Sequence, residues 1–142
     1  MNFELTQERQ MLQDSLQRYL RDKYTTETRN AILQSEAGMS EEIWQQLADL
    51  GVIAALFAEE QGGFGGAGFD LAVVFEALGR AGVVEPFMET AILAGGLIAR
   101  LGNPAQQDLL DRLMAGGLQL AFAHGEPTGR YDLTHVATTA RV

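Results

Sequence analysis

The sequence has 142 residues, with 10 Lys and Arg against 19 Asp and Glu and no Cys, so its formal net charge is −9. The length fits one domain, and 46% hydrophobic with 20% charged residues is typical of a folded globular chain. The acidic balance argues against a nucleic-acid partner or an anionic membrane surface, and the lack of Cys with only 2 His argues against a metal site. No apolar run approaches the roughly 20 residues of a membrane span, and the start lacks a signal-peptide core, so we expect a cytoplasmic protein.

The first 51 residues predict three helices. Thr6 is a good N-cap for a helix over 6–23, a shorter helix follows over 27–36, and Ser40 opens a third helix that stops at Gly51. The apolar residues recur at helical spacing: Leu12, Leu16, Tyr19 and Leu20 in the first helix, and Ile43, Trp44, Leu47 and Leu50 in the third. We expect Trp44 to belong to the core rather than to stack on a cofactor.

The middle of the chain predicts a central helix. Residues 52–57 form a short apolar run that could be a buried extended segment or the wall of a bundle, and a glycine-rich loop follows. Asp70 is the expected N-cap of a helix over 71–81 that is apolar nearly all round, so we expect it to be buried. On this helix Glu76 and Arg80 are four residues apart and can form a buried or half-buried pair.

Two more helices follow. Pro86 fits the first turn of a helix that runs to Leu101. Asn103, Pro104 and Gln106 then give a strong helix start, with an N-cap, a proline at the first position and a capping-box Gln. Helices joined by short capped loops predict an all-α fold, an antiparallel helical bundle over residues 1–117.

The pattern changes at residue 118. Leu118, Leu120 and Phe122 alternate with period two, and HVATTARV repeats a strand-like composition after a polar turn. Two strands alone do not make a stable sheet. We therefore expect residues 118–142 to be the start of a β-domain of which the remainder is missing, and the sequence to be a fragment.

Three glycines of the central loop have the spacing of a nucleotide-binding motif. Gly63, Gly65 and Gly68 match the G-x-G-x-x-G spacing of a dinucleotide-binding turn. The charged stretch 59–61 separates them from the preceding apolar run, however, and no alternating strands surround them. A connection between two helices is the favoured interpretation.

The order of these elements resembles the N-terminal helical domain of the acyl-CoA dehydrogenase family, over nearly the whole chain. The residues that carry the resemblance are Leu5-Thr6 with Glu8, Trp44 with Leu47, Leu50 and Gly51, Glu59-Glu60 with Gly62-Gly63 and Gly65, Asp70 with Val74, Glu76, Leu78, Gly79 and Arg80, Gly102-Asn103 with Gln107, and Ala123 with Glu126-Pro127 and Asp132.

The resemblance implies a flavoenzyme in which two helical domains flank a small β-domain, with FAD bound across subunits of a homo- or hetero-oligomer. The oligomer it implies is a dimer or a tetramer, with the FAD between the subunits of a dimer within the tetramer. It also implies oxidation of an acyl-CoA to the 2,3-enoyl-CoA, with an electron-transfer flavoprotein as a possible acceptor. A glutamate base takes the α proton, and that base normally lies in or near the C-terminal domain. We therefore expect no catalytic residue in these 142 positions, so this polypeptide alone is not the catalyst.

The resemblance places FAD contacts on Phe122, His124, Gly125, Arg130 and Tyr131. The family pattern there has a small residue, Thr-Glu-Pro, two variable residues and Gly-Ser-Asp. In this sequence Gly125 stands at the Thr position, so a hydroxyl bond to the flavin is lost, and Arg130-Tyr131 replaces Gly-Ser. An Arg at a glycine position restricts the backbone.

The same departures resemble the small subunits of two-subunit acyl-CoA dehydrogenases of the pimeloyl-CoA type. In such enzymes one subunit can carry weakened cofactor or catalytic motifs. Three functions therefore stay open: the N-terminal domain of a catalytic dehydrogenase, a non-catalytic or half-active partner subunit, or an unrelated helical interaction module. Arg130 and Tyr131 could also serve the FAD phosphate or ring by a different geometry.

By the same resemblance, the helix after the central one lines part of the acyl cavity. The matching substrate residues are Glu89, Thr90 and Leu93, followed by the small residues 94–96. Small residues leave room for a long or bulky acyl chain, but they equally permit close helix packing.

Overall fold

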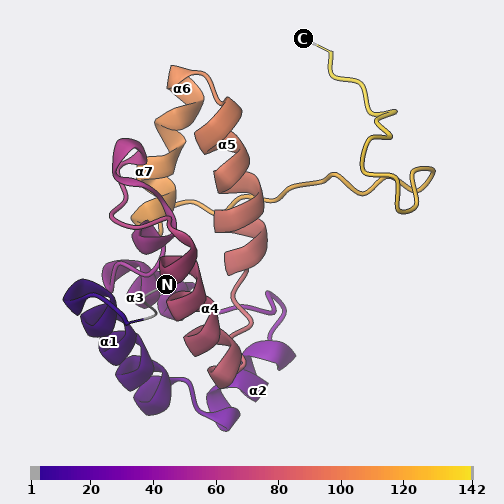
Figure 1. The fold of residues 1–142 in the computed structure, drawn as a ribbon. Helices are drawn as coiled ribbons and strands as arrows, with labels where there is room; N and C mark the ends of the chain where they lie inside the picture. The colour runs from indigo at the N-terminus through magenta and orange to yellow at the C-terminus, as the bar shows by residue number, and fades with distance from the viewer. Residues whose placement is uncertain (1–3, 142) are drawn as a thin grey trace.

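The computed structural model describes residues 4–141, and every regular element in this range is helical (Figure 1). The elements in chain order are α1 (Gln7–Lys23), α2 (Thr26–Gln34), α3 (Glu41–Asp49), the 3₁₀ turns η1 (Ala54–Leu56) and η2 (Glu59–Gln61), α4 (Gly68–Ala81), the π-helix η3 (Met88–Gly95), α5 (Gly96–Leu101), α6 (Pro104–Gln107) and α7 (Leu109–Met114). Helix α1 packs along α4, and α7 packs against η3. The expected all-α bundle is confirmed.

Local caps begin the helices where the sequence predicts. The side chains of Thr6, Ser40 and Asn103 accept hydrogen bonds from backbone amides three residues ahead, at 3.4, 3.2 and 2.9 Å. Each bond satisfies one of the amides that a helix start leaves unpaired. The predicted starts of α1, α3 and α6 are therefore confirmed.

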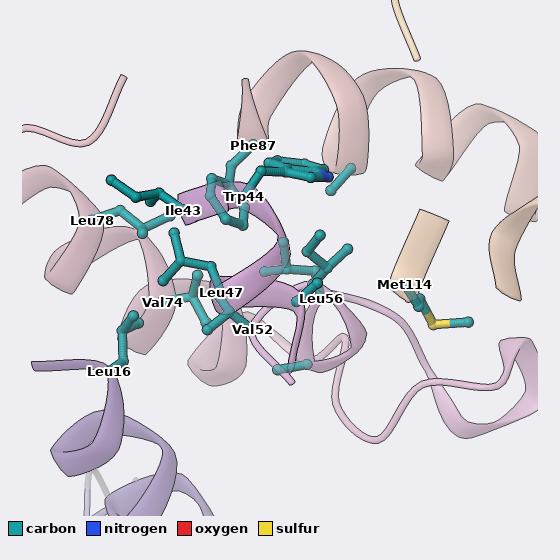
Figure 2. Close-up of a cluster of buried hydrophobic side chains, with 14 of the residues drawn as sticks. Leu16, Ile43, Trp44, Leu47, Val52, Leu56, Val74, Leu78, Phe87 and Met114 are labelled. Atoms are coloured by element: carbon teal, nitrogen blue, oxygen red, sulfur yellow. The ribbon is translucent and has the colours of Figure 1, made fainter. Parts of the chain in front are cut away.

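The core joins elements that are far apart in the sequence (Figure 2). The ring of Trp44 lies 4.9 Å from that of Phe87, and its indole N–H donates to the carbonyl of Gly116 at 3.0 Å. Trp44 is buried, as expected of a core residue. The apolar run 52–57 is neither extended nor a full helix but contains the buried turn η1, and Val52 and Ile53 are completely buried.

Helix α4 corrects two predictions. It begins at Gly68 rather than Leu71, with Ala67 as N-cap, and the Asp70 carboxylate accepts the amide of Ala67 at 3.0 Å from inside the first turn. The stretch 71–81 is also not buried all round, because Ala72, Glu76 and Arg80 are exposed on one face. Tertiary packing covers only the face that meets the core, whatever the composition of the other.

The charge pair on that helix also lies at the surface. Glu76 and Arg80 form the expected pair, with an Nη2–Oε1 distance of 2.7 Å. Both side chains are more than half exposed, not half-buried as expected, at 53% and 74%. Such a pair contributes little to stability.

The helix predicted over 86–101 changes its winding. Residues Met88–Gly95 form a π-helix that continues directly into α5. Periodicity alone does not distinguish α- from π-winding over one or two turns, because both keep an apolar face.

The strand-like runs after residue 118 form no ladder within the described part of the chain. Residues 118–141 follow an irregular path that leaves the bundle (Figure 1). Extended backbone needs a partner strand for its amides and carbonyls, and this range offers none. The β-domain proposed for residues 118–142 therefore remains a prediction; Val142 lies outside the described residues.

Candidate functional site

The glycine-rich loop after η2 packs closely against the backbone of residues 54–58. The amides of residues 63–66 donate to carbonyls of residues 54–58 at 2.9–3.3 Å. A Cβ on Gly63 would overlap the carbonyls of Ala54 and Phe57, and one on Gly65 would overlap that of Ala55. These amides are already paired within the chain, so they cannot hold a pyrophosphate, and the dinucleotide interpretation is excluded here.

Two acidic residues of the helical body have structural partners. Asp70 binds Arg9 with both carboxylate oxygens, at 2.6 Å to Nε and 3.2 Å to Nη2, and so ties α4 to α1. Glu85 is buried and accepts the hydroxyl of Tyr24 at 2.9 Å and the amide of Ser40 at 3.2 Å. Each carboxylate is held by donors of the helical body, which accounts for both as structural groups.

The sequence offered a weak sign of this buried acid. Glu85 stands among apolar residues, with Val83, Val84 and Phe87 around it. A lone carboxylate in such a run often has a buried partner. Its partner Tyr24 is 61 residues away, and no local spacing identifies it.

The segment expected to hold FAD is a self-contained loop. The Glu126 carboxylate accepts the amide of Ala137 at 2.8 Å, and the amide and hydroxyl of Thr138 at 2.9 and 2.7 Å. The Thr138 hydroxyl, followed by the two amides, lowers the pKa of Glu126. The Thr128 Oγ1 and His135 Nε2 atoms form a hydrogen bond of 3.0 Å inside the loop. Glu126 therefore closes the loop over residues 126–138, a role that the sequence reasoning missed because its partners lie 11 and 12 residues away.

Arg130 keeps a glycine-like backbone. Its φ is 48°, in the left-handed region that a glycine adopts without strain. The Arg at the family's glycine position therefore does not forbid that conformation but takes it at a cost of about 1–2 kcal/mol. Its guanidinium makes no hydrogen bond with any described residue.

The structure brings two of the five expected cofactor residues together. The rings of Phe122 and His124 stack with centroids 5.0 Å apart and an interplanar angle of 13°. A Cβ added to Gly125 would meet no atom within 4 Å, so open space lies beside it. Tyr131 is 98% exposed and contacts neither ring in the described structure. Phe122, His124 and Gly125 thus share one short stretch, while Arg130 and Tyr131 lie on the loop beyond it.

These residues fit FAD in chemistry, but they do not enclose it. An unpaired guanidinium suits a phosphate, and flat exposed rings suit a flavin. Open space beside Gly125 admits a ring but supplies no side-chain donor. The described residues can therefore form one side of a cofactor site at most.

The three residues expected to contact substrate separate into two groups. Glu89 and Leu93 are exposed on the π-helix, and Leu93 keeps 40% of its surface accessible. Thr90 is completely buried, and its hydroxyl donates to the carbonyl of Leu120 at 2.9 Å. Thr90 has no surface left for an acyl chain.

Of the small residues that follow, Gly95 permits a close helix contact, and Gly96 lies beside open space. A Cβ on Gly95 would come within 2.8 Å of both Leu113 and Phe57, which accounts for the glycine by close helix contact. Gly96 has nothing within 4 Å and lines a cavity of about 240 Å³ with Arg100 and apolar side chains. Glu89, Thr90 and Leu93 do not line this cavity.

Residues 4–141 contain neither a metal-binding cluster nor a helix that could cross a membrane. No group of three or more His, Cys, Asp or Glu residues lies close enough to hold a metal ion. No helix in this range combines the length and apolar character that crossing a membrane requires.

Comparison with known proteins places the helical body in a family. The family model described as "Acyl-CoA dehydrogenase, N-terminal domain" matches residues 6–117. Acyl-CoA dehydrogenase IpdE2 of Mycobacterium tuberculosis is 33% identical over 101 residues, which are 70% of this chain and 32% of that protein. Acyl-CoA dehydrogenase FadE27 of the same species is 31% identical over 83 residues, 58% of this chain and 22% of that protein. The chain thus spans a third or less of these relatives.

Solved structures agree with this placement. A variant of the Tcur3481-Tcur3483 steroid ACAD superposes with a TM-score of 0.74 at 30% identity, over 84% of this chain and 33% of that one. The ChsE4-ChsE5 complex of Mycobacterium tuberculosis gives 0.74 at 28%, over 85% and 34%. Butyryl-CoA dehydrogenase of Megasphaera elsdenii gives 0.68 at 26%, over 94% and 36%. This chain therefore belongs to the acyl-CoA dehydrogenase family, and its helical body is the N-terminal domain of that family.

Proposed function

We propose that this chain forms the N-terminal part of an FAD-dependent acyl-CoA dehydrogenase, which oxidises an acyl-CoA thioester to the 2,3-enoyl-CoA. The observation that carries the proposal is the combination of a family-type helical body with the exposed segment 122–131, which follows it directly. In the complete protein FAD would accept the hydride that leaves the β carbon of the substrate.

Within this assembly the chain's own residues bind and orient. The guanidinium of Arg130 is available for a cofactor phosphate, and the stacked rings of Phe122 and His124 offer a flat aromatic surface. Glu126 holds the loop that carries Arg130. The base that removes the α proton, and the surfaces that exclude water, come from outside these residues, and electrons leave to an acceptor such as an electron-transfer flavoprotein.

A second candidate is a non-catalytic partner subunit of a hetero-oligomeric dehydrogenase. The departures at Gly125, Arg130 and Tyr131 favour it, because they remove the usual side-chain donor and leave Tyr131 without a contact. One related structure is a complex of two named components, ChsE4 and ChsE5, which supports a hetero-oligomer as the form to test.

Flavin content tests the proposed function. The protein, made from its complete coding sequence, is purified alone and after co-expression with an adjacent acyl-CoA dehydrogenase homologue. We expect the yellow flavin spectrum in at least one preparation, and bleaching on addition of an acyl-CoA. A short-chain and a steroid-type acyl-CoA are compared, because relatives of both kinds superpose on this chain. Colourless protein in both preparations would contradict the proposal.

Substitution of Gly125 and Tyr131 distinguishes the two candidates. Weakened flavin contacts at these positions fit a non-catalytic partner subunit, whereas replaced contacts fit a catalytic domain. If they are weakened flavin contacts, Gly125→Thr with Tyr131→Ser should raise flavin retention a few-fold to about tenfold, since a hydrogen bond contributes about 0.5–1.5 kcal/mol. If Arg130 and Tyr131 have become the site's own contacts, Tyr131→Ser alone should lower the flavin content and the double change should not restore it. The FAD-to-protein ratio after gel filtration decides between these outcomes.

A further inference from the structure

The π-helix η3 carries a buried hydroxyl, that of Thr90, which bonds to the segment that leaves the helical body. A threonine in a helix can bond back to a carbonyl of its own preceding turn. In Met88–Gly95 the Thr90 hydroxyl instead donates to the carbonyl of Leu120, 30 residues later, at 2.9 Å. Thr90 has no exposed surface, whereas Leu120 is half-buried, so the bond lies at the edge of the core with its hydroxyl end inside. Single π-turns are frequent where a helix serves a functional site.

Leu120 is the point at which the chain leaves the helical body. Its side chain is the last along the chain to pack against the core. Within the described range, no hydrogen bond joins residues 121–141 to the helices, and the loop 126–138 bonds only to itself. Figure 1 shows the segment passing α5 and then extending away from the bundle. The direction of everything beyond Leu120 therefore depends on how Leu120 is held.

We propose that Thr90 is a positioning residue for the cofactor segment, not a contact for the acyl chain. By fixing the Leu120 carbonyl, its hydroxyl sets the orientation in which the stacked rings of Phe122 and His124 emerge, two and four residues further on. The anchoring of Leu120 stands on the structure alone. Its consequence for FAD rests on the proposed function.

The anchoring is measured by NMR on the chain itself. Thr90→Val keeps the shape of the side chain and removes the hydroxyl, whereas Thr90→Ser keeps the hydroxyl. We expect Thr90→Val to shift the ¹³C carbonyl resonance of Leu120 and to lower the backbone order of residues 120–122, and Thr90→Ser to restore both. Thr26→Val, the same change at an exposed helical site, should leave Leu120 unaffected.

Two results would overturn the anchoring. One is a Leu120 carbonyl that does not respond to Thr90→Val. The other needs no variant, and so remains available if Thr90→Val does not fold: a fast-exchanging Thr90 hydroxyl proton in the wild-type chain, without an Overhauser contact to Leu120 or Ala121.

The consequence for the cofactor is measured in the complete protein, co-expressed with the adjacent acyl-CoA dehydrogenase homologue. We expect Thr90→Val to weaken FAD binding about three- to tenfold, as loss of one positioning bond would, and Thr90→Ser to bind like wild type. Equal FAD affinity in all three proteins, or a rise in the acyl-CoA KM at unchanged flavin content, would overturn the positioning role in favour of a substrate contact. Wild-type protein without flavin would contradict the proposed function instead, and the Leu120 resonance would then decide the anchoring by itself.

Discussion

Among residues 4–141, Arg130 is the one non-glycine residue with a left-handed backbone, at φ 48°. Its side chain has no partner in the described structure, so the backbone strain and the guanidinium can be separated by mutation. Glycine takes this conformation freely, whereas a β-branched residue does so only at high cost.

We expect Arg130→Gly to preserve or increase the order of the loop and Arg130→Val to reduce it, by about 1–2 kcal/mol relative to glycine. Both variants lack the guanidinium, so their difference reports the backbone alone. Hydrogen exchange of the Ala137 and Thr138 amides, which are bonded to Glu126, measures this difference. Equal exchange in the two variants would mean that residue 130 is not held in the left-handed conformation.

Glu126 gives the same loop a pH dependence. The hydrogen bonds from Thr138 and Ala137 lower its pKa, so the folded loop favours the carboxylate. The resulting stabilisation is complete above the ordinary carboxyl pKa and is lost as the pH falls through the lowered one. We expect the Ala137 and Thr138 amide resonances to lose their hydrogen-bonded shifts at acidic pH.

The control for that titration is Glu126→Gln, which should have no such acidic step. Asp132, whose pKa is also lowered because the Thr134 hydroxyl and amide donate to it, needs a second control, Asp132→Asn. An acidic step that persists in Glu126→Gln and vanishes in Asp132→Asn would show that Asp132, not Glu126, carries the pH dependence.

At the scale of elements, the loop before α4 is defined by contact with η1. Gly65→Ala would place a methyl group against the Ala55 carbonyl and force the loop away from η1. We expect a loss of about 1–3 kcal/mol in the free energy of unfolding, as for other overpacked sites. Urea denaturation followed by the fluorescence of the buried Trp44 provides the measurement.

Gly68→Ala is the matched control, because its Cβ would meet nothing within 4 Å at the start of α4. Alanine in a helix should be neutral or stabilising there, by up to about 1 kcal/mol. If the two substitutions had equal effects, close packing would not be the reason for the glycines in this loop.

At the scale of the whole molecule, Tyr24 and Glu85 join three parts of the chain. Tyr24 follows α1, Glu85 follows α4, and the amide of Ser40 before α3 donates to the same carboxylate. The amide of Val84 in turn donates to the Tyr24 oxygen at 3.0 Å. This set of bonds ties the end of α1 to the start of α3 and to the turn that leads into the π-helix.

We expect Tyr24→Phe to lower the free energy of unfolding by about 1–3 kcal/mol, because Glu85 loses a donor and Val84 an acceptor in a buried place. Burial raises the pKa of Tyr24 to about 12 from 10.0. The stabilisation is therefore complete below the ordinary tyrosine pKa and is lost as the pH rises through the raised one. Wild type and variant should converge in stability over that alkaline range.

Tyr19→Phe is the matched control for this prediction. Tyr19 is only half-buried, and its hydroxyl donates to Gln46 at 2.7 Å. We expect a smaller loss than for Tyr24→Phe. Denaturation curves that placed the two variants at the same stability would contradict a special role for the buried Glu85.

Much of the helical body was predictable because its signals are local. The caps at Thr6, Ser40 and Asn103 act on amides three residues away, and so they can be read directly from the sequence. The family resemblance covered the same elements and is confirmed. The candidate site was less predictable from the sequence. Its five cofactor residues were named by resemblance, and their contacts with FAD stay predictions.

The sequence by itself thus determined the helical class, most helix starts and the family, because capping and apolar periodicity act over a few residues. Only the tertiary structure decided which face of α4 is covered, where the chain adopts π-winding, and that Thr90 bonds to Leu120 rather than facing a cavity. The bond from Thr90 to Leu120 joins residues 30 positions apart, and the bond from Tyr24 to Glu85 joins residues 61 positions apart. Local pattern carries no information about such partners, because packing of the whole chain brings them together.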